Sequence, residues 1–314
     1  MFGKAFVRDL MVRSAENDED RRRFLKSAGV AGLGLVGAAA MSGTASASSG
    51  SPGRTADGYS EGPSDSAILN FALNLEYLEA EFYSFAATGQ GLPDSMTGGT
   101  GVKGGVTGGR KVAFSTKQAR QYAEEIALDE HNHVSFLRAA LGGAKVARPA
   151  INIRDSFTAA AQAAGLITAG QTFDPYANEN NFLLAAFIFE DVGVTAYKGA
   201  APLISNKTYL EAAAGILAVE AYHAATIRAT LYERGLAAAT NKISNARDSL
   251  DGASDLDQGT AREGKRNITP VDGNSIAFSR SAGQVLNVVY LNPNPVRKGG
   301  FFPAGVNGAI NTSA

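Results

Sequence analysis

The chain has no cysteine among its 314 residues, and this absence excludes disulfides, thiol catalysis and thiolate metal sites. Any bound metal would need carboxylate, imidazole, backbone or water ligands, which suit iron, manganese or zinc better than Cu(I) or an iron–sulfur cluster. Neither sign of charge is in excess, with 29 basic and 30 acidic residues, so the basic face typical of nucleic-acid-binding proteins is not expected. Histidine is also scarce, with three residues, and their positions prove informative.

The first 47 residues have the pattern of an export signal. A basic cluster, RRRFLK at 21–26, precedes an uncharged stretch rich in glycine and alanine, and Ala45-Ser46-Ala47 matches an A-x-A cleavage pattern. The cluster resembles the twin-arginine signal R-R-x-F-L-K, with Arg21 and Arg22 as the pair. We expect the twin-arginine export machinery to recognise residues 1–47 and the mature protein to be periplasmic or extracellular. The apolar part is too short for a stable membrane span, although an uncleaved anchor is the alternative.

The mature chain has the apolar periodicity and cap residues of an all-α fold. Residues 48–63, rich in Ser, Gly and Pro, predict a flexible linker. Ser115 and Gln118 have the spacing of a capping box at the start of the second helix. The long helices are expected at about 64–89, 115–142, 178–200 and 207–238, with a short extra helix at about 154–164. These elements predict a four-helix bundle over residues 64–240.

Two segments fall outside the helical pattern. The glycine-rich stretch 88–110 lacks the Gly-Lys-Ser/Thr of a phosphate-binding loop, and we expect a disordered connection rather than a lid or partner surface. Residues 241–314 predict a C-terminal extension that packs on the bundle and contains short strands at NSIAF (274–278) and QVLNVVY (284–290). Its final part is a glycine-rich tail, and the Phe301–Phe302 pair in this tail is expected to be exposed.

The histidines lie in two matching motifs within the predicted helices. Glu130-x-x-His133 and Glu220-x-x-His223 each place a carboxylate and an imidazole one turn apart on the same helical face. One such pair is half of a metal site, and two pairs on facing helices could bind two ions. His131 is rotated about 100° from Glu130, so we expect it on the surface.

The other two long helices supply the remaining carboxylates. Glu190 follows eight apolar residues, and an ionised carboxylate is costly there unless it is paired or binds metal. Glu76 is followed after seven residues by Tyr83, and Glu190 by Tyr197, so each tyrosine shares the face of its glutamate. The chain therefore repeats Glu-x6-Tyr and Glu-x2-His twice, which predicts two hairpins that each carry half of a pseudo-symmetric site.

The predicted ligands are Glu76, Glu130, His133, Glu190, Glu220 and His223. Their four carboxylates balance two divalent cations, and oxygen and imidazole donors fit Fe or Mn. Glu79 is the rival to Glu76, but the spacing to Tyr83 favours Glu76.

Several neighbouring residues have two alternative roles. Tyr83 and Tyr197 could hydrogen bond to ligands, or they could be ordinary core tyrosines. Asp191 could hold a ligand imidazole, or it could cap a polar seam. Arg138 and Arg228 lie about 140° from their histidines and are expected to form salt bridges on the outside.

This pattern resembles the ferritin-like superfamily of di-iron and di-manganese carboxylate proteins. In that family helices 1 and 3 each give a Glu, and helices 2 and 4 each give Glu-x-x-His. The resemblance covers about residues 64–238, and all six ligand positions fit. The segment LNLEYLEAEFY, the twin-arginine signal and the C-terminal NITPVDGN…AFSRSAGQVLNVVY also resemble exported ferritin-like proteins, a group that includes desiccation-related proteins of plants and bacteria.

The resemblance implies a dinuclear site rather than one reaction. The first hypothesis is a redox metalloprotein that reacts with O₂ or peroxide, either as a ferroxidase or as a manganese-catalase-like peroxide dismutase. The alternative is a non-enzymatic desiccation or stress protein whose metal site is stabilising or vestigial. Iron storage ranks last, because the extension and the glycine-rich loop are poor fits to a minimal cage subunit. No organic cofactor is expected, no catalytic residue is assigned, and a homo-oligomer is left open.

Overall fold

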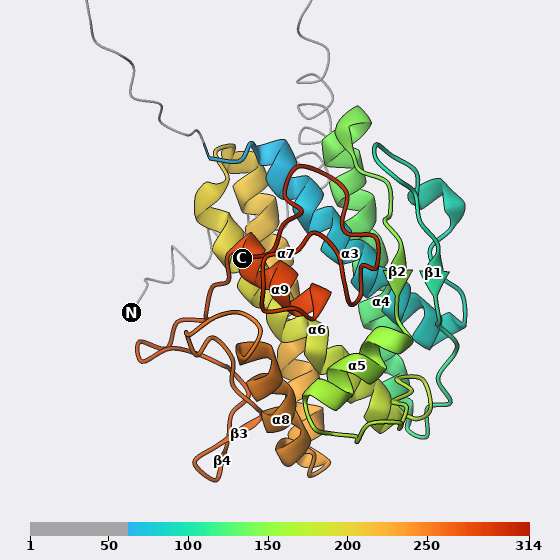
Figure 1. Cartoon of the computed structure of the whole chain (residues 1–314), viewed down its shortest axis with the longest axis vertical. Helices are drawn as coiled ribbons and strands as arrows, with labels where there is room; N and C mark the ends of the chain where they lie inside the picture. The colour runs from blue at the N-terminus through green and yellow to red at the C-terminus, as the bar shows by residue number, and fades with distance from the viewer. Residues whose placement is uncertain (1–61) are drawn as a thin grey trace, which may run out of the picture. The chain divides into compact units, whose positions relative to one another are not determined.

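Four long helices form the centre of the fold in the computed structural model, which describes residues 62–314 (Figure 1). These helices are α3 (Asp65–Thr88), α4 (Lys117–Leu141), α6 (Glu179–Ala200) and α7 (Lys207–Glu233). The helix α3 packs along α4, and α6 packs along α7, so two helical hairpins face each other and contact mainly through α3 and α6. The predicted all-α fold class is confirmed. The predicted signal peptide and nearly all of the linker lie outside the described residues.

The helices begin close to the predicted cap residues. The side chains that accept a hydrogen bond from a first-turn N–H are those of Ser64, Thr116, Asn178 and Asn206. The predicted capping box is wrong, because Thr116 rather than Ser115 caps α4, and the Gln118 amide donates to the Tyr122 hydroxyl. The fourth helix ends at Glu233 rather than near 238, because the chain turns at Gly235, where φ is 72°.

The glycine-rich segment after α3 is a structured loop, not a disordered connection. It contains η1 (Asp94–Met96) and β1 (Val106–Thr107), and β1 pairs in parallel with β2 (Ile151–Asn152). Gly104 is needed there, because a Cβ at this position would collide with the backbone of Ala150. The connections after α4 and α6 contain η2 (Gly142–Ala144), α5 (Asp155–Ala163) and η3 (Ala201–Leu203), and α5 matches the predicted short helix.

The C-terminal extension is more helical than its sequence suggested. It begins with α8 (Ala237–Asp248), continues through the antiparallel pair β3 (Ala261–Arg262) and β4 (Lys265–Arg266), and ends with α9 (Ala282–Tyr290) and a long loop. QVLNVVY therefore belongs to α9 and not to a strand, and NSIAF contributes only the isolated bridge Val271–Ala277. Ser281 and Gln284 form a capping box that starts α9, whereas a short apolar run alone does not distinguish a strand from a buried helix.

The extension covers the α3/α6 side of the bundle. Figure 1 shows α9 and the final loop lying across this side. Phe301 and Phe302 are fully buried rather than exposed, and the Phe301 ring lies 5.0 Å from the ring of Phe157 and 4.9 Å from that of Phe189. The tail therefore contributes to the core. Within residues 62–314, no helix combines the length and the apolar character needed to cross a membrane.

Candidate metal centre

The bundle brings the six predicted ligand side chains together. Each residue is 8% exposed or less, and all four long helices contribute at least one. The potential ligand atoms of Glu76, Glu130, His133 and Glu220 lie within 4.8 Å of one another. Those of Glu190, Glu220 and His223 do so as well. Glu220 belongs to both groups, so the two potential ion positions are adjacent.

The two imidazoles face a shared set of carboxylates. His133 Nδ1 lies 3.2 Å from Glu76 Oε2, 3.4 Å from Glu130 Oε2 and 3.5 Å from Glu220 Oε1. On the other side, His223 Nδ1 lies 3.2 Å from Glu130 Oε1 and 3.6 Å from Glu190 Oε2. Each oxygen of Glu130 thus faces a different imidazole, and Glu130 and Glu220 are the carboxylates placed to bridge two ions. Glu76 and Glu190, from the other two helices, each face one imidazole only.

The polar atoms that point into the cluster have no hydrogen-bond partners. Eight atoms of the six residues, including both Nδ1 atoms and both oxygens of Glu130 and Glu220, are buried and unsatisfied within the part of the chain that the structure describes. Buried polar groups are almost always hydrogen bonded, so such a concentration needs an explanation. Carboxylate oxygens and imidazole nitrogens are suitable ligands for iron and manganese. The residues present therefore fit a pair of such cations.

Tyrosine hydroxyls occupy the outer oxygens of the terminal carboxylates. Tyr83 of α3 donates to Glu190 Oε1 of α6, and Tyr197 of α6 donates to Glu76 Oε1 of α3. Each tyrosine therefore binds the glutamate of the facing helix, not that of its own helix. These crossed hydrogen bonds leave Glu76 Oε2 and Glu190 Oε2 directed at the imidazoles.

The electrostatics of the cluster favour positive charge in its interior. Burial raises the pKa of Glu76 to about 8, against the lowering effect of His133. Burial likewise raises the pKa values of Glu190 and Glu220. Burial acts to lower the pKa of His223, but Glu190 and the other carboxylates outweigh this and raise it to about 10. The cluster thus favours protons or cations in its interior, which is the electrostatic condition for binding metal.

Two further acidic residues, neither of them among the six predicted ligands, lie near the cluster. Asp129 Oδ2 lies 3.1 Å from His223 Nε2, so it holds the imidazole in the way that had been considered for Asp191. Its position directly before Glu130 was the available signal. Glu79, which had been set aside in favour of Glu76, is only 6% exposed and is also near the cluster.

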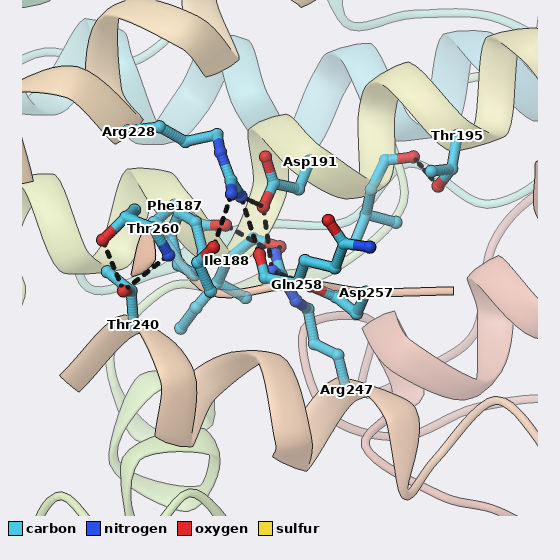
Figure 2. A network of polar contacts seen from close by, with 12 residues as sticks. Phe187, Ile188, Asp191, Thr195, Arg228, Thr240, Arg247, Asp257, Gln258 and Thr260 are labelled. Atoms are coloured by element: carbon cyan, nitrogen blue, oxygen red, sulfur yellow. Dashed lines mark hydrogen bonds and ion pairs between the residues drawn. The ribbon is translucent and has the colours of Figure 1, made fainter. Parts of the chain in front are cut away.

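Asp191 and Arg228 belong to a separate buried network (Figure 2). Asp191 Oδ2 accepts hydrogen bonds from Arg228 Nη1 at 2.7 Å and Arg247 Nη2 at 3.0 Å. Arg228 is fully buried, so its predicted place on the outside is wrong. It also donates to four backbone carbonyls between residues 258 and 268. Asp191 therefore caps a polar seam, the second alternative above, and the seam fixes the extension to α6 and α7.

Arg138, which has the same place in the repeat as Arg228, also forms hydrogen bonds to neutral groups. Arg138 is half-buried and donates to the Tyr77 hydroxyl at 2.5 Å and to the carbonyl of Gly98 at 2.6 Å. It therefore anchors the glycine-rich loop rather than forming the predicted external salt bridge. His131 is half-buried and lies outside both ligand groups.

A surface cavity reaches one residue of the cluster, His223. It has a volume of about 300 Å³ and lies between α4 and α7, which pack together less closely than the helices of each hairpin. Tyr122, Ile126 and Asp129 line it from α4, and Tyr222, His223 and Thr226 line it from α7. Because His223 forms part of its wall, a small molecule in this cavity would lie against one of the six predicted ligands.

A four-helix bundle with two Glu-x-x-His helices and two Glu helices around a buried cluster defines the chain as a ferritin-like protein. The chain belongs to this family, since a sequence model of the ferritin-like domain matches residues 64–233. It is also similar to the desiccation-related protein PCC13-62 of Craterostigma plantagineum, with 35% identity over 258 residues that cover 74% of this chain and 80% of the relative. A second relative is the ferritin-like catalase Nec2 of Nesocodon mauritianus, with 30% identity over 265 residues that cover 78% of this chain and 84% of the relative. No solved structure matches the chain.

Proposed function

We propose that this chain is an exported ferritin-like metalloprotein that binds two iron or manganese ions and converts hydrogen peroxide into water and oxygen. The observation that carries the proposal is the convergence of eight unsatisfied polar atoms from six buried Glu and His residues. The catalase name of one relative supports peroxide rather than O₂ as the substrate. The twin-arginine pattern at 21–26 supports export, and conversion of Arg21 and Arg22 to Lys is expected to leave the precursor in the cytoplasm.

The chain's own residues would hold and shield the ions. Glu76, Glu130 and His133, together with Glu220, would bind one ion, and Glu190, Glu220 and His223 would bind the other. A pair of such ions supplies two electrons to one peroxide molecule and recovers them from a second. Burial of all six ligands excludes bulk water, and the hydroxyls of Tyr83 and Tyr197 fix the terminal carboxylates.

Peroxide would enter through the cavity between α4 and α7. The cavity volume of about 300 Å³ is far above the roughly 10–15 Å³ that one water needs by the same measure, so peroxide fits with room for water. Asp129 in its wall orients the imidazole of His223. Thr226→Trp fills this space without changing a proposed ligand, and we expect it to lower kcat/KM for peroxide while the metal content stays unchanged.

The test is oxygen evolution from peroxide by protein loaded with Mn(II) or Fe(II). Glu130→Gln, which alters a carboxylate facing both imidazoles, is expected to abolish oxygen evolution and to reduce the bound metal. Glu124→Gln is the matched control, because Glu124 lies on the exposed face of the same helix. If wild-type protein binds two ions per chain but releases no oxygen, the catalase proposal is wrong and the site has another role.

The name of the desiccation-related relative favours a second candidate, a non-enzymatic stress protein. In that case the metal pair would act as a cross-link between the two hairpins. Stabilisation by metal without peroxide turnover would support this candidate.

A further inference from the structure

Glu79 is a further buried carboxylate beside the six proposed ligands, of which four are carboxylates. It lies three residues after Glu76, one turn further along the same face of α3. It makes no hydrogen bond or ion pair with any residue in the described range 62–314. Burial raises the pKa of Glu79, and four carboxylates of the cluster, led by that of Glu220, raise it further. A buried acid without a partner is costly, so its presence at this position needs a reason.

The internal repeat shows that Glu79 breaks the pseudo-symmetry of the site. Alignment of Glu76–Tyr83 with Glu190–Tyr197 places Glu79 opposite Gly193. A Cβ at Gly193 would lie 2.6 Å from Glu220 Oε2 and 3.6 Å from Glu79 Oε1. One helix thus supplies an additional carboxylate, and the other supplies the space that Glu79 and Glu220 share.

The C-terminal extension encloses this space from the side opposite the α4/α7 cavity. Glu79 and Gly193 line a cavity of about 20 Å³ together with Val288 and Val289 of α9 and Phe301 of the final loop. A cavity of this size holds about one water molecule. The apolar cover leaves Glu79 only 6% exposed, and Glu79 Oε1 lies beside the same Gly193 position that Glu220 Oε2 approaches.

We propose that Glu79 is an additional carboxylate ligand of the dinuclear centre and that it makes the two ion positions inequivalent. The inference rests on the proposed function, because it requires that the cluster binds metal. The two proposed ion positions share Glu220, and of α3 and α6 only α3 offers a second glutamate. One of the two ions should therefore be bound more tightly than the repeated Glu and His ligands alone would allow.

The experiment is a titration with Mn(II) of wild type, Glu79→Gln and Glu81→Gln, followed by competition with a chelator. Glu81 is the matched control, because it is buried on the same helix but binds Arg148 and the backbone N–H of Leu92. For Glu79→Gln we expect one Mn(II) per chain to bind 10–100-fold more weakly, the usual range for loss of a supporting group, and the other to change less than about threefold. Glu81→Gln should bind both ions as wild type does.

A second readout separates a ligand from a structural acid. The metal-free Glu79→Gln protein should melt at a higher temperature than metal-free wild type, because a buried, unpartnered acid is gone, while its stabilisation by Mn(II) is smaller. Gly193→Ala provides an independent variant, since the added Cβ displaces Glu220 and should also weaken Mn(II) binding. Two-ion binding by Glu79→Gln within twofold of wild type would overturn the inference and leave the proposed function intact. Failure of wild type to bind Mn(II) or Fe(II) would overturn both.

Discussion

Replacement of Glu190 by Gln should separate two effects of the cluster on stability. One is the cost of a buried carboxylate in the metal-free protein, and the other is the stabilisation by bound metal. The substitution keeps the volume and leaves an amide oxygen to accept the hydrogen bond from Tyr83. It removes one of the buried carboxylates whose Oε2 lacks a partner in the described structure. We expect the metal-free variant to be more stable than metal-free wild type near neutral pH, and the metal-loaded variant to gain less from metal.

The size of the metal effect follows from mass action. An ion that binds only the folded state stabilises it by about 2.7 kcal/mol at a hundredfold excess over its dissociation constant. For a domain of this size, this corresponds to an increase in Tm of roughly 5–10 °C. A hundredfold weaker site at the same free metal concentration contributes only about 0.4 kcal/mol. Loss of Glu190 should therefore remove most of the increase due to one ion.

The raised pKa of Glu190 determines how the stability difference between metal-free Glu190→Gln and wild type changes with pH. Burial raises the pKa of Glu190 well above its ordinary value in the folded chain. Its contribution to stability is therefore fully present below the unfolded pKa of about 4.3 and is lost as pH rises towards the folded pKa. The advantage of metal-free Glu190→Gln should grow between pH 4 and pH 7, whereas the metal effect in wild type should shrink in acid because protons compete for the ligands.

Thermal melting of wild type, Glu190→Gln and the exposed control Glu124→Gln, with and without Mn(II) or Fe(II), tests this reasoning. The control should match wild type in every condition. If wild type melts at the same temperature with and without either metal at neutral pH, the cluster is not a metal site and the proposed function is lost with it.

Three further outcomes are expected. Arg228→Leu should lower the free energy of unfolding by about 3–5 kcal/mol in urea titrations, because it leaves buried acceptors without a donor; a change below 1 kcal/mol would contradict the role of this side chain as an anchor. Glu179→Gln should destabilise the protein by about 1–3 kcal/mol at pH 7. Burial acts to raise the pKa of Glu179, but Thr116 and Arg234 lower it to about 2, so the difference from wild type should vanish as pH falls from about 4.5 to 2. Tyr83→Phe should weaken Mn(II) binding about tenfold without preventing folding, as equilibrium dialysis and circular dichroism would show.

The bundle could be predicted because its signals are local. Periodicity, caps and the doubled Glu-x-x-His spacing each depend on residues within one helix, and a helix fixes which side chains share a face. The repeat added the one non-local fact needed, namely that the two hairpins are related. The repeat allowed the six side chains to be placed together. It did not predict the crossed partners of Tyr83 and Tyr197, because spacing within one helix does not show which side chain of another helix faces a tyrosine.

The wrong predictions concern residues whose burial depends on segments that lie far away in the sequence. Arg228 has the helical position of a surface residue until residues 258–268 cover it, and Phe301 looks exposed in a glycine-rich tail until it packs on Phe157. α9 illustrates the same limit, since its apolar run fits a strand or a buried helix equally well. In each case the extension and the bundle determine each other's structure.

The two faces of the bundle therefore have different roles. A doubled site would be equally open on both sides if nothing else were present, yet α9 and the final loop close the α3/α6 side, whereas the cavity between α4 and α7 remains. The proposed substrate would approach from the side of His223 and Asp129, whereas Glu79 lies on the other side in a small cavity that Phe301 also lines. The extension therefore makes the surroundings of the two hairpins unequal, with a large cavity beside His223 on one side and a small apolar cavity beside Glu79 on the other.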